Sequence, residues 1–197
     1  FCRGHMDMMI NDTASTREVA SIIEKNTGRK ALSAPLPIGL YDYQRWLRQI
    51  GEIMGTEVES EIERAGLEQT EFLEAHRHHF SGKKMILMNR SFHNIDWLID
   101  MLIGLEVNIV RIGRTSSPRK GASMNISRYS NITTSDYDTD GLKRDLEHLD
   151  PDVLISDLAA LMEGRCRSAR VGKIGLGIRS TMEYIEYLEN IMRLPKE

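Results

Sequence analysis

The stretch between residues 84 and 112 constrains the fold more than any other part of the sequence. An apolar run at 84–88 precedes a segment with helical apolar spacing at 94–102, and a second apolar run follows at 107–112 after a turn at Gly104. This order predicts a βαβ unit, whose strands are parallel and whose crossover is right-handed. Parallel sheets are covered on both faces. The predicted fold class is therefore α/β, a Rossmann-like parallel sheet with helices on both faces.

Helical and extended patterns continue on both sides of this unit. A helix is predicted from Ser15, as its N-cap, to Gly28, a second between Gly39 and Gly55, and a more polar third from Thr56 through Phe72. Strand and helix then alternate towards the end of the chain. The predicted elements are a helix at 140–149, strands at 152–155 and 168–171, and a last helix at 180–194.

Length and composition limit the domain organisation. The 197 residues, 41% hydrophobic and 28% charged, are typical of a globular chain with one large unit or two unequal lobes. We interpret residues 1–6 as vector-derived, because Gly-His-Met is a common cloning remnant. Residues 7–80 are predicted to form a helical lead-in and partial α/β lobe, and residues 81–197 the Rossmann-like domain.

Charge and cysteine usage exclude several classes of partner. The net charge of −3 argues against nucleic acid, and no apolar run approaches the roughly 20 residues that span a membrane. The two cysteines, Cys2 and Cys166, lack the paired spacing of a disulfide framework or zinc site. We therefore expect a reducing, cytoplasmic location with no nucleic-acid or membrane partner.

The loop after the strand at 107–112 is the first candidate site, because open α/β sheets bind ligands at the carboxyl ends of their strands. Its cations and hydroxyls suit a phosphate or carboxylate. The residues concerned are Arg114, Thr115, Ser116, Arg119 and Lys120. The alternative is a solvated basic surface loop.

Three further strand ends carry candidate residues. Arg90 and His93 lie between a strand and a helix, where they could line an anion site, although capping of the helix explains them as well. Asp157 follows the strand at 152–155 and could be an acid or a ligand anchor, although capping of the following helix explains it equally well. Lys173 lies in a glycine-rich run that lacks the frame of a phosphate loop, so we interpret that run as a mobile loop that shapes a cleft.

Two features that suggest a metal or a nucleophile have simpler explanations. His76 and His79 share a helical face with no carboxylate at a convincing spacing, so a solvated helix end that also includes His78 is favoured over a metal site. Cys166 has cationic neighbours that would favour a thiolate, but no base for catalysis is identifiable. No metal ligand is predicted in this chain.

Several phrases, taken in order, resemble the nitrogenase component 1-like family, which includes nitrogenase chains, their cofactor-assembly homologues, protochlorophyllide reductase and other tetrapyrrole reductases. Each phrase is weak alone, and the resemblance depends on their joint order. The phrases are the Pro-rich entry at 35–39, the Gly-Lys strand opening at 82–87, the turn at 102–107, the Pro-Asp strand at 149–155 and the Arg-Val-Gly phrase at 170–172.

The resemblance implies a function for the intact protein. Its members take electrons from an ATP-dependent iron-sulfur partner, pair with a homologous or identical subunit, and reduce a bound metallocofactor or tetrapyrrole. An iron-sulfur cluster is expected in the full-length family but not in this chain, because cluster ligation requires several cysteines. The loop after Ile112 contains no Cys and no His lies in 172–180, which disfavours dinitrogen reduction. A tetrapyrrole reductase similar to the nickel-sirohydrochlorin reductive cyclase is favoured, with the chain by itself inactive.

Two rival functions remain open at this point. The first is a non-catalytic module that binds a small anion or assists metallocofactor assembly on the same fold. The second is a nucleotide-dependent enzyme, which the absence of a Gly-x-Gly-x-x-Gly turn after a strand disfavours.

Overall fold

The computed structural model describes residues 14–28, 32, 34–89, 95–114, 129, 133–134, 138–156, 166–171 and 174–195. Within these ranges all the strands form one parallel sheet in the order β3-β2-β1-β4-β5. The strands are β1 (Lys84–Asn89), β2 (Asn108–Arg114), β3 (Thr133–Thr134), β4 (Val153–Ser156) and β5 (Arg167–Ala169). The predicted α/β class and parallel βαβ unit are confirmed.

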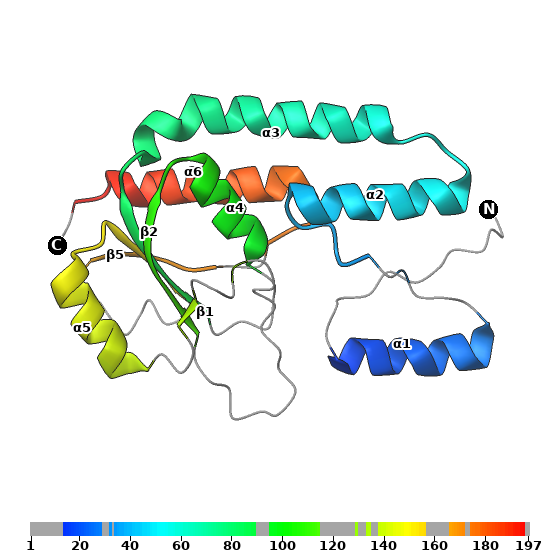
Figure 1. The fold of residues 1–197 in the computed structure, drawn as a ribbon, viewed down its shortest axis with the longest axis horizontal. Helices are drawn as coiled ribbons and strands as arrows, with labels where there is room; N and C mark the ends of the chain where they lie inside the picture. Colours follow the sequence, from blue (N-terminus) through cyan, green and yellow to red (C-terminus); the bar gives the residue numbers. More distant parts are fainter. Residues whose placement is uncertain are drawn as a thin grey trace.

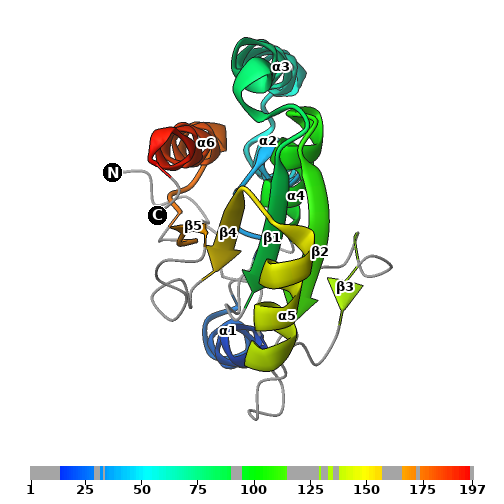
Figure 2. The same ribbon diagram turned by 90° about the vertical axis from the view of Figure 1, so that its left-hand side faces the viewer.

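Helices cover both faces of this sheet (Figures 1 and 2). In Figure 2, α5 lies in front of the strands and α4 behind them, with α3 above the sheet. Residues of α4 and α6 belong to the same core layer, on the side opposite α5. The helices are α1 (Ala14–Thr27), α2 (Leu40–Met54), α3 (Glu59–Phe80), α4 (Asp96–Gly104), α5 (Thr139–Leu149) and α6 (Ile178–Arg193). None of the described helices is long and apolar enough to cross a membrane.

Alternation along β1 divides the core into two layers. Met85 and Leu87 face the larger layer, which includes α4 and α6, while Ile86 and Met88 face the layer under α5. All four side chains are at most 2% exposed. A strand that is buried on both sides has a continuous run of apolar residues. This is why β1 could be predicted from the sequence. Ala65 and Phe80 of α3 belong to the larger layer.

Several element boundaries differ from the prediction by a few residues, and three differences affect the interpretation. α3 begins at Glu59 rather than Thr56 and continues to Phe80, so it includes all three histidines at 76–79. α1 already includes Ser15, which was predicted to precede it as a cap. β3 has only two residues and carries no periodic pattern, so it was not predicted. The division of the chain at residue 80 stays a prediction.

The turn from α4 into β2 also differs from its prediction. Gly104 is the last residue of α4, and the left-handed conformation falls on Glu106, whose φ is 59°. Two backbone hydrogen bonds hold this turn, from Glu106 N to the Ile103 carbonyl at 2.9 Å and from Val107 N to the Leu102 carbonyl at 2.9 Å. The chain therefore turns directly after Gly104, as predicted, but the positive φ lies at Glu106 and not at the glycine.

A side-chain cap begins α5 and gives a direct stability prediction. The Asp138 carboxylate accepts a hydrogen bond from Gly141 N at 2.7 Å. We expect Asp138→Ala to lower the free energy of unfolding by about 1 kcal/mol, because an N–H group of the first turn loses its partner. Urea denaturation measures the loss. Asp138→Asn keeps an acceptor and should stay within a few tenths of a kcal/mol of the parent protein; an equal loss in both variants would contradict the capping role.

Candidate functional site

The carboxyl ends of β1 and β4 mark the point at which the strand order reverses. From β1 the chain crosses to β2 and β3 on one side, then returns to β4 and β5 on the other. Ligands of open α/β sheets bind in the crevice at such a reversal. Asn89 pairs in register with Arg114 of β2, and Met88 pairs with Ser156 at the end of β4. The topology therefore places the ends of β1, β2 and β4 next to one another.

The residues predicted as sites from the sequence follow these strand ends, but their side chains lie outside the described residues. Arg114 is described in its backbone only, as the last residue of β2. The other eight positions are not described: Arg90, His93, Thr115, Ser116, Arg119, Lys120, Asp157 and Lys173. Their roles in anion binding stay predictions.

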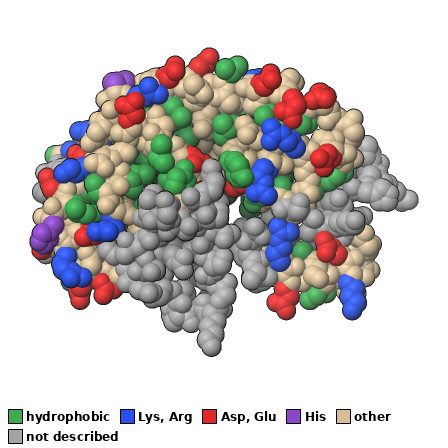
Figure 3. Space-filling model, in the orientation of Figure 1, with side chains coloured by type: hydrophobic (Ala, Val, Ile, Leu, Met, Phe, Trp, Pro, Cys, Tyr) green, Lys and Arg blue, Asp and Glu red, His purple; other side chains and the backbone are tan. Residues whose placement is uncertain are grey.

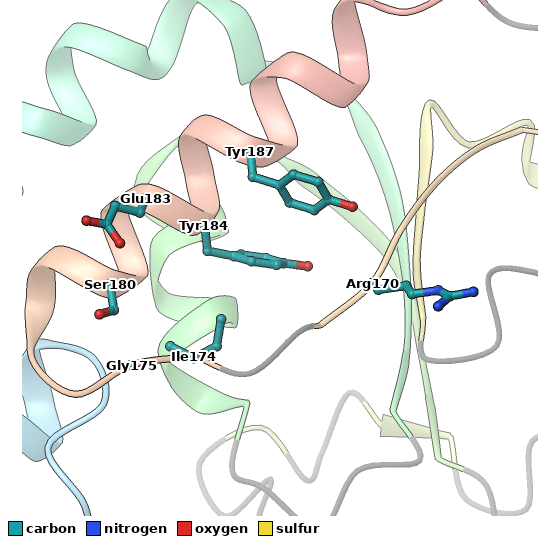
Figure 4. A pocket seen from close by; sticks show the side chains of 7 residues that line it. All are labelled: Arg170, Ile174, Gly175, Ser180, Glu183, Tyr184 and Tyr187. Atoms are coloured by element: carbon teal, nitrogen blue, oxygen red, sulfur yellow. The ribbon is translucent and has the colours of Figure 1, made fainter.

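A cavity of about 370 Å³ lies beside the carboxyl end of β5, between α6 and the segment that leads to it (Figure 4). This volume is at the lower end of the range typical of small-molecule sites. Its lining combines two aromatic rings with two charged residues of opposite sign. The lining residues are Arg170, Ile174, Gly175, Ser180, Glu183, Tyr184 and Tyr187. None of these was predicted as a site residue, except that the glycine-rich run was expected to shape a cleft.

The walls of this cavity are fixed by contacts with the core. The ring of Tyr184 is 6% exposed and meets Trp97 of α4 edge to face, with centroids 5.5 Å apart. Gly177 N donates to the Pro37 carbonyl at 2.6 Å, which anchors the start of α6 to the segment before α2. A Cβ at Gly175 would come within 2.5 Å of Ser180 Oγ, so glycine permits this wall to lie close to the helix.

A second polar cluster joins α3 to the C-terminal half of α6. The Glu189 carboxylate, on a residue only 7% exposed, accepts hydrogen bonds from His76 Nδ1 at 2.7 Å and forms ion pairs with His79 Nε2 at 3.2 Å and with Arg193. The His76 ring also stacks on Phe72. The expectation of a solvated helix end is therefore wrong for His76 and His79.

The electrostatic state of Glu189 follows from these contacts. Burial alone would raise the pKa of its carboxyl, but the hydrogen bond from His76 and the nearby charges of His79 and Arg193 outweigh burial and lower it below 4.5. Glu189 lies on the apolar stripe of α6, next to Leu188. A carboxylate on the apolar stripe of a helix indicates a buried residue that needs a cationic partner. This signal was not used to predict the cluster from the sequence.

The donor atoms available for a metal centre are few. Among the described residues, no three His, Cys, Asp or Glu side chains are grouped so as to hold a metal ion. Cys166 is half-buried, packs beside the layer under α5, and precedes β5, which places it at the amino end of the strands, away from the edge where the order reverses. The two cysteines in the sequence are fewer than the four thiolates that usually hold an iron-sulfur cluster, and the expectation that this chain binds none stays a prediction.

The parallel sheet and its strand order define a Rossmann-like α/β protein. Comparison with protein families is more specific: residues 2–172 match the family described as nitrogenase component 1 type oxidoreductase. The chain belongs to that family, as its sequence phrases indicated. The matched range includes residues 2–6, and their interpretation as vector-derived stays a prediction.

Solved structures agree on the fold. The chain is similar to "Nitrogenase Cp1 at pH 6.5" with a TM-score of 0.65 and 17% identity, covering 94% of this chain and 44% of that one. The chain is also similar to "Nitrogenase Cp1 at pH 5" with a TM-score of 0.65 and 15% identity, covering 95% of this chain and 46% of that one. The chain thus spans less than half the length of these proteins. A search of curated proteins finds no match.

Proposed function

We propose that this chain is the α/β part of a reductase subunit that receives electrons from an ATP-dependent iron-sulfur protein and delivers them to a bound metallocofactor or tetrapyrrole. The observation that carries the proposal is the family match over residues 2–172. The strand order reverses between β1 and β4, which is the position at which open α/β sheets hold such ligands. The subunit would pair with a homologous or identical chain.

In this proposal, the chain binds and orients the metallocofactor or tetrapyrrole that is to be reduced. Its two cysteines are too few to ligate a cluster by themselves. The predicted basic residues after β1, β2 and β5 would supply cations to the carboxylates or phosphates of the bound group. A redox cluster in the assembled protein would require thiolates from outside this sequence. The reason is that this sequence has two cysteines, whereas a cluster is usually held by four thiolates.

The test is to purify the full-length native protein without oxygen and to measure its iron and acid-labile sulfide together with its visible absorption. We expect a stoichiometric cluster that oxidises and reduces reversibly. Adding an ATP-dependent iron-sulfur reductase and MgATP should then reduce it. A colourless, iron-free protein would overturn the reductase and leave a non-catalytic binding or assembly module on the same fold.

Cys166→Ala is the control within this chain. Because Cys166 lies at the amino end of the strands, the variant should retain the iron and sulfide content of the parent protein. Loss of iron from this variant, with the far-UV circular dichroism unchanged, would show that the cluster depends on this thiol, and the binding role proposed for the opposite edge would then be wrong.

A further inference from the structure

The apolar stripe of α1 faces outward. Val19 and Ile22 are each 56% exposed, whereas the small Ala20, which faces the protein, is 3% exposed. Figure 1 places α1 below α2 and apart from the sheet, and Figure 3 shows hydrophobic side chains at the surface of α1. A helix on a globular protein normally turns its larger apolar side chains towards the core. The outward face of α1 is therefore a surface on which a further chain would gain apolar burial.

Two charged residues lie at the ends of this outward face. Glu18, Ile22 and Lys25 are spaced four and three residues apart, so they lie along one side of the helix. Glu18 and Lys25 are both exposed, and seven residues separate them by about 10 Å along the helix axis. The face is negative towards the start of α1, apolar in the middle and positive towards its end.

A face with this pattern is complementary to a copy of itself when the two helices run antiparallel. A two-fold axis beside Ile22 places Glu18 of each chain next to Lys25 of the other, so that one ion pair forms at each end of the contact. The Val19 and Ile22 side chains of both copies then meet between the two ion pairs. A parallel arrangement would bring like charges together at both ends, which is destabilising.

We infer that α1 forms an antiparallel pair with α1 of a second copy of this chain. The inference rests on the proposed function only for the pairing of subunits and needs no cluster, cofactor or electron partner, so its test can fail while the measurement of iron succeeds. One helix pair buries less than the roughly 1,200 Å² of a standard interface, so we expect a weak dimer with a dissociation constant on the order of 100 μM.

The test is sedimentation equilibrium of the 197-residue chain. A monomer–dimer equilibrium is expected over loading concentrations from about 10 μM to about 1 mM. Ile22→Ser should weaken dimerisation about tenfold, because each dimer loses two apolar side chains from its centre. Ile53→Ser is the matched control, since Ile53 is 43% exposed on α2 and outside the face, and it should leave dimerisation unchanged. A strict monomer, or equal effects of the two variants, would overturn the inference.

Charge reversal identifies both the partner and the orientation. Glu18→Lys alone and Lys25→Glu alone place like charges at both ends of the pair, so each variant should dimerise about tenfold more weakly than the parent protein. An equimolar mixture of the two variants restores opposite charges at both ends and should associate as tightly as the parent. Helix weakening by either substitution persists in the mixture, so it does not produce this gain. A mixture that associates no better than each variant alone would overturn the inference.

The full-length native protein decides between a second copy and another part of the same polypeptide as the covering surface. With a second copy, Ile22→Ser weakens self-association and leaves the unfolding midpoint of the monomer in urea close to that of the parent. If the same variant instead lowers that midpoint and leaves the oligomeric state unchanged, the face is covered within one chain and the inference is overturned.

Discussion

Gly39→Ala is expected to lower the free energy of unfolding by about 4 kcal/mol, the largest effect predicted for a single methyl group in this protein. Gly39 precedes α2 with φ 78° and ψ 162°, a backbone region that is essentially restricted to glycine. A Cβ at this position would overlap the Cβ of Trp97 on α4. Neither atom is the flexible end of a side chain, so relief requires α2 and α4 to move apart.

Gly177→Ala separates the two contributions to this loss. Gly177 precedes α6 with φ 85° and ψ 174°, so its backbone is in nearly the same conformation, but a Cβ there would have no neighbour within 4 Å. We expect a loss of about 2 kcal/mol from backbone strain alone. Urea denaturation of both variants measures the difference, which is the contribution of the Trp97 contact. Equal losses would contradict the clash.

The Gly39 variant also bears on the cavity, because Trp97 supports Tyr184. A displaced Trp97 would loosen the aromatic wall, and the fluorescence of the variant should report a changed tryptophan environment before unfolding. Unchanged fluorescence together with full stability would mean that α4 accommodates the extra methyl group.

Glu189→Gln is expected to lower the free energy of unfolding by about 2 kcal/mol at neutral pH. The substitution keeps the size of the side chain but removes the negative charge that His76, His79 and Arg193 share. Hydrogen bonds to a charged group contribute about 1.5–3 kcal/mol, and loss of the buried charge affects several of them together. Glu186→Gln, on the exposed side of the same helix, is the matched control and should change stability by less than about 0.5 kcal/mol.

The pH dependence of this loss has a definite sign. The pKa of Glu189 is lowered in the folded protein relative to 4.5, so its stabilising effect is complete above pH 4.5 and disappears as the pH falls through the folded value. The stability difference between the parent protein and Glu189→Gln should therefore shrink below pH 4.5. Urea denaturation at a series of pH values measures it. A difference that stays constant into strong acid would show that Glu189 stabilises the fold through packing and not through its charge.

The sequence predicted the central βαβ unit because its apolar periodicity is local. β1 is buried on both sides and α4 carries an apolar stripe, so each pattern can be recognised within a short window. Predictions from local patterns were wrong where a tertiary contact overrides the local preference of the sequence. Glu106 takes a positive φ although it is not glycine, and the last turns of α3 look solvated in sequence, yet they pack on α6.

The two polar sites show the same limit more sharply. His76 and Glu189 are 113 residues apart, and no spacing rule connects a helix in the first half of the chain to one at its end. The cavity likewise combines Arg170 after β5 with Tyr187 two turns into α6, on opposite sides of a glycine-rich segment. Residues after strand ends could be selected from the sequence because parallel topology brings those ends together.

The sequence by itself determined the α/β class, the parallel βαβ unit and the family, because these depend on periodicity and on phrases read in order. The tertiary structure decided which polar groups meet. Only the packing of α6 against α3 and α4 makes Glu189 a buried counterion and Tyr184 a fixed wall. Contacts between distant segments depend on how amphipathic surfaces are paired in space, and that pairing leaves no periodic trace in either segment alone.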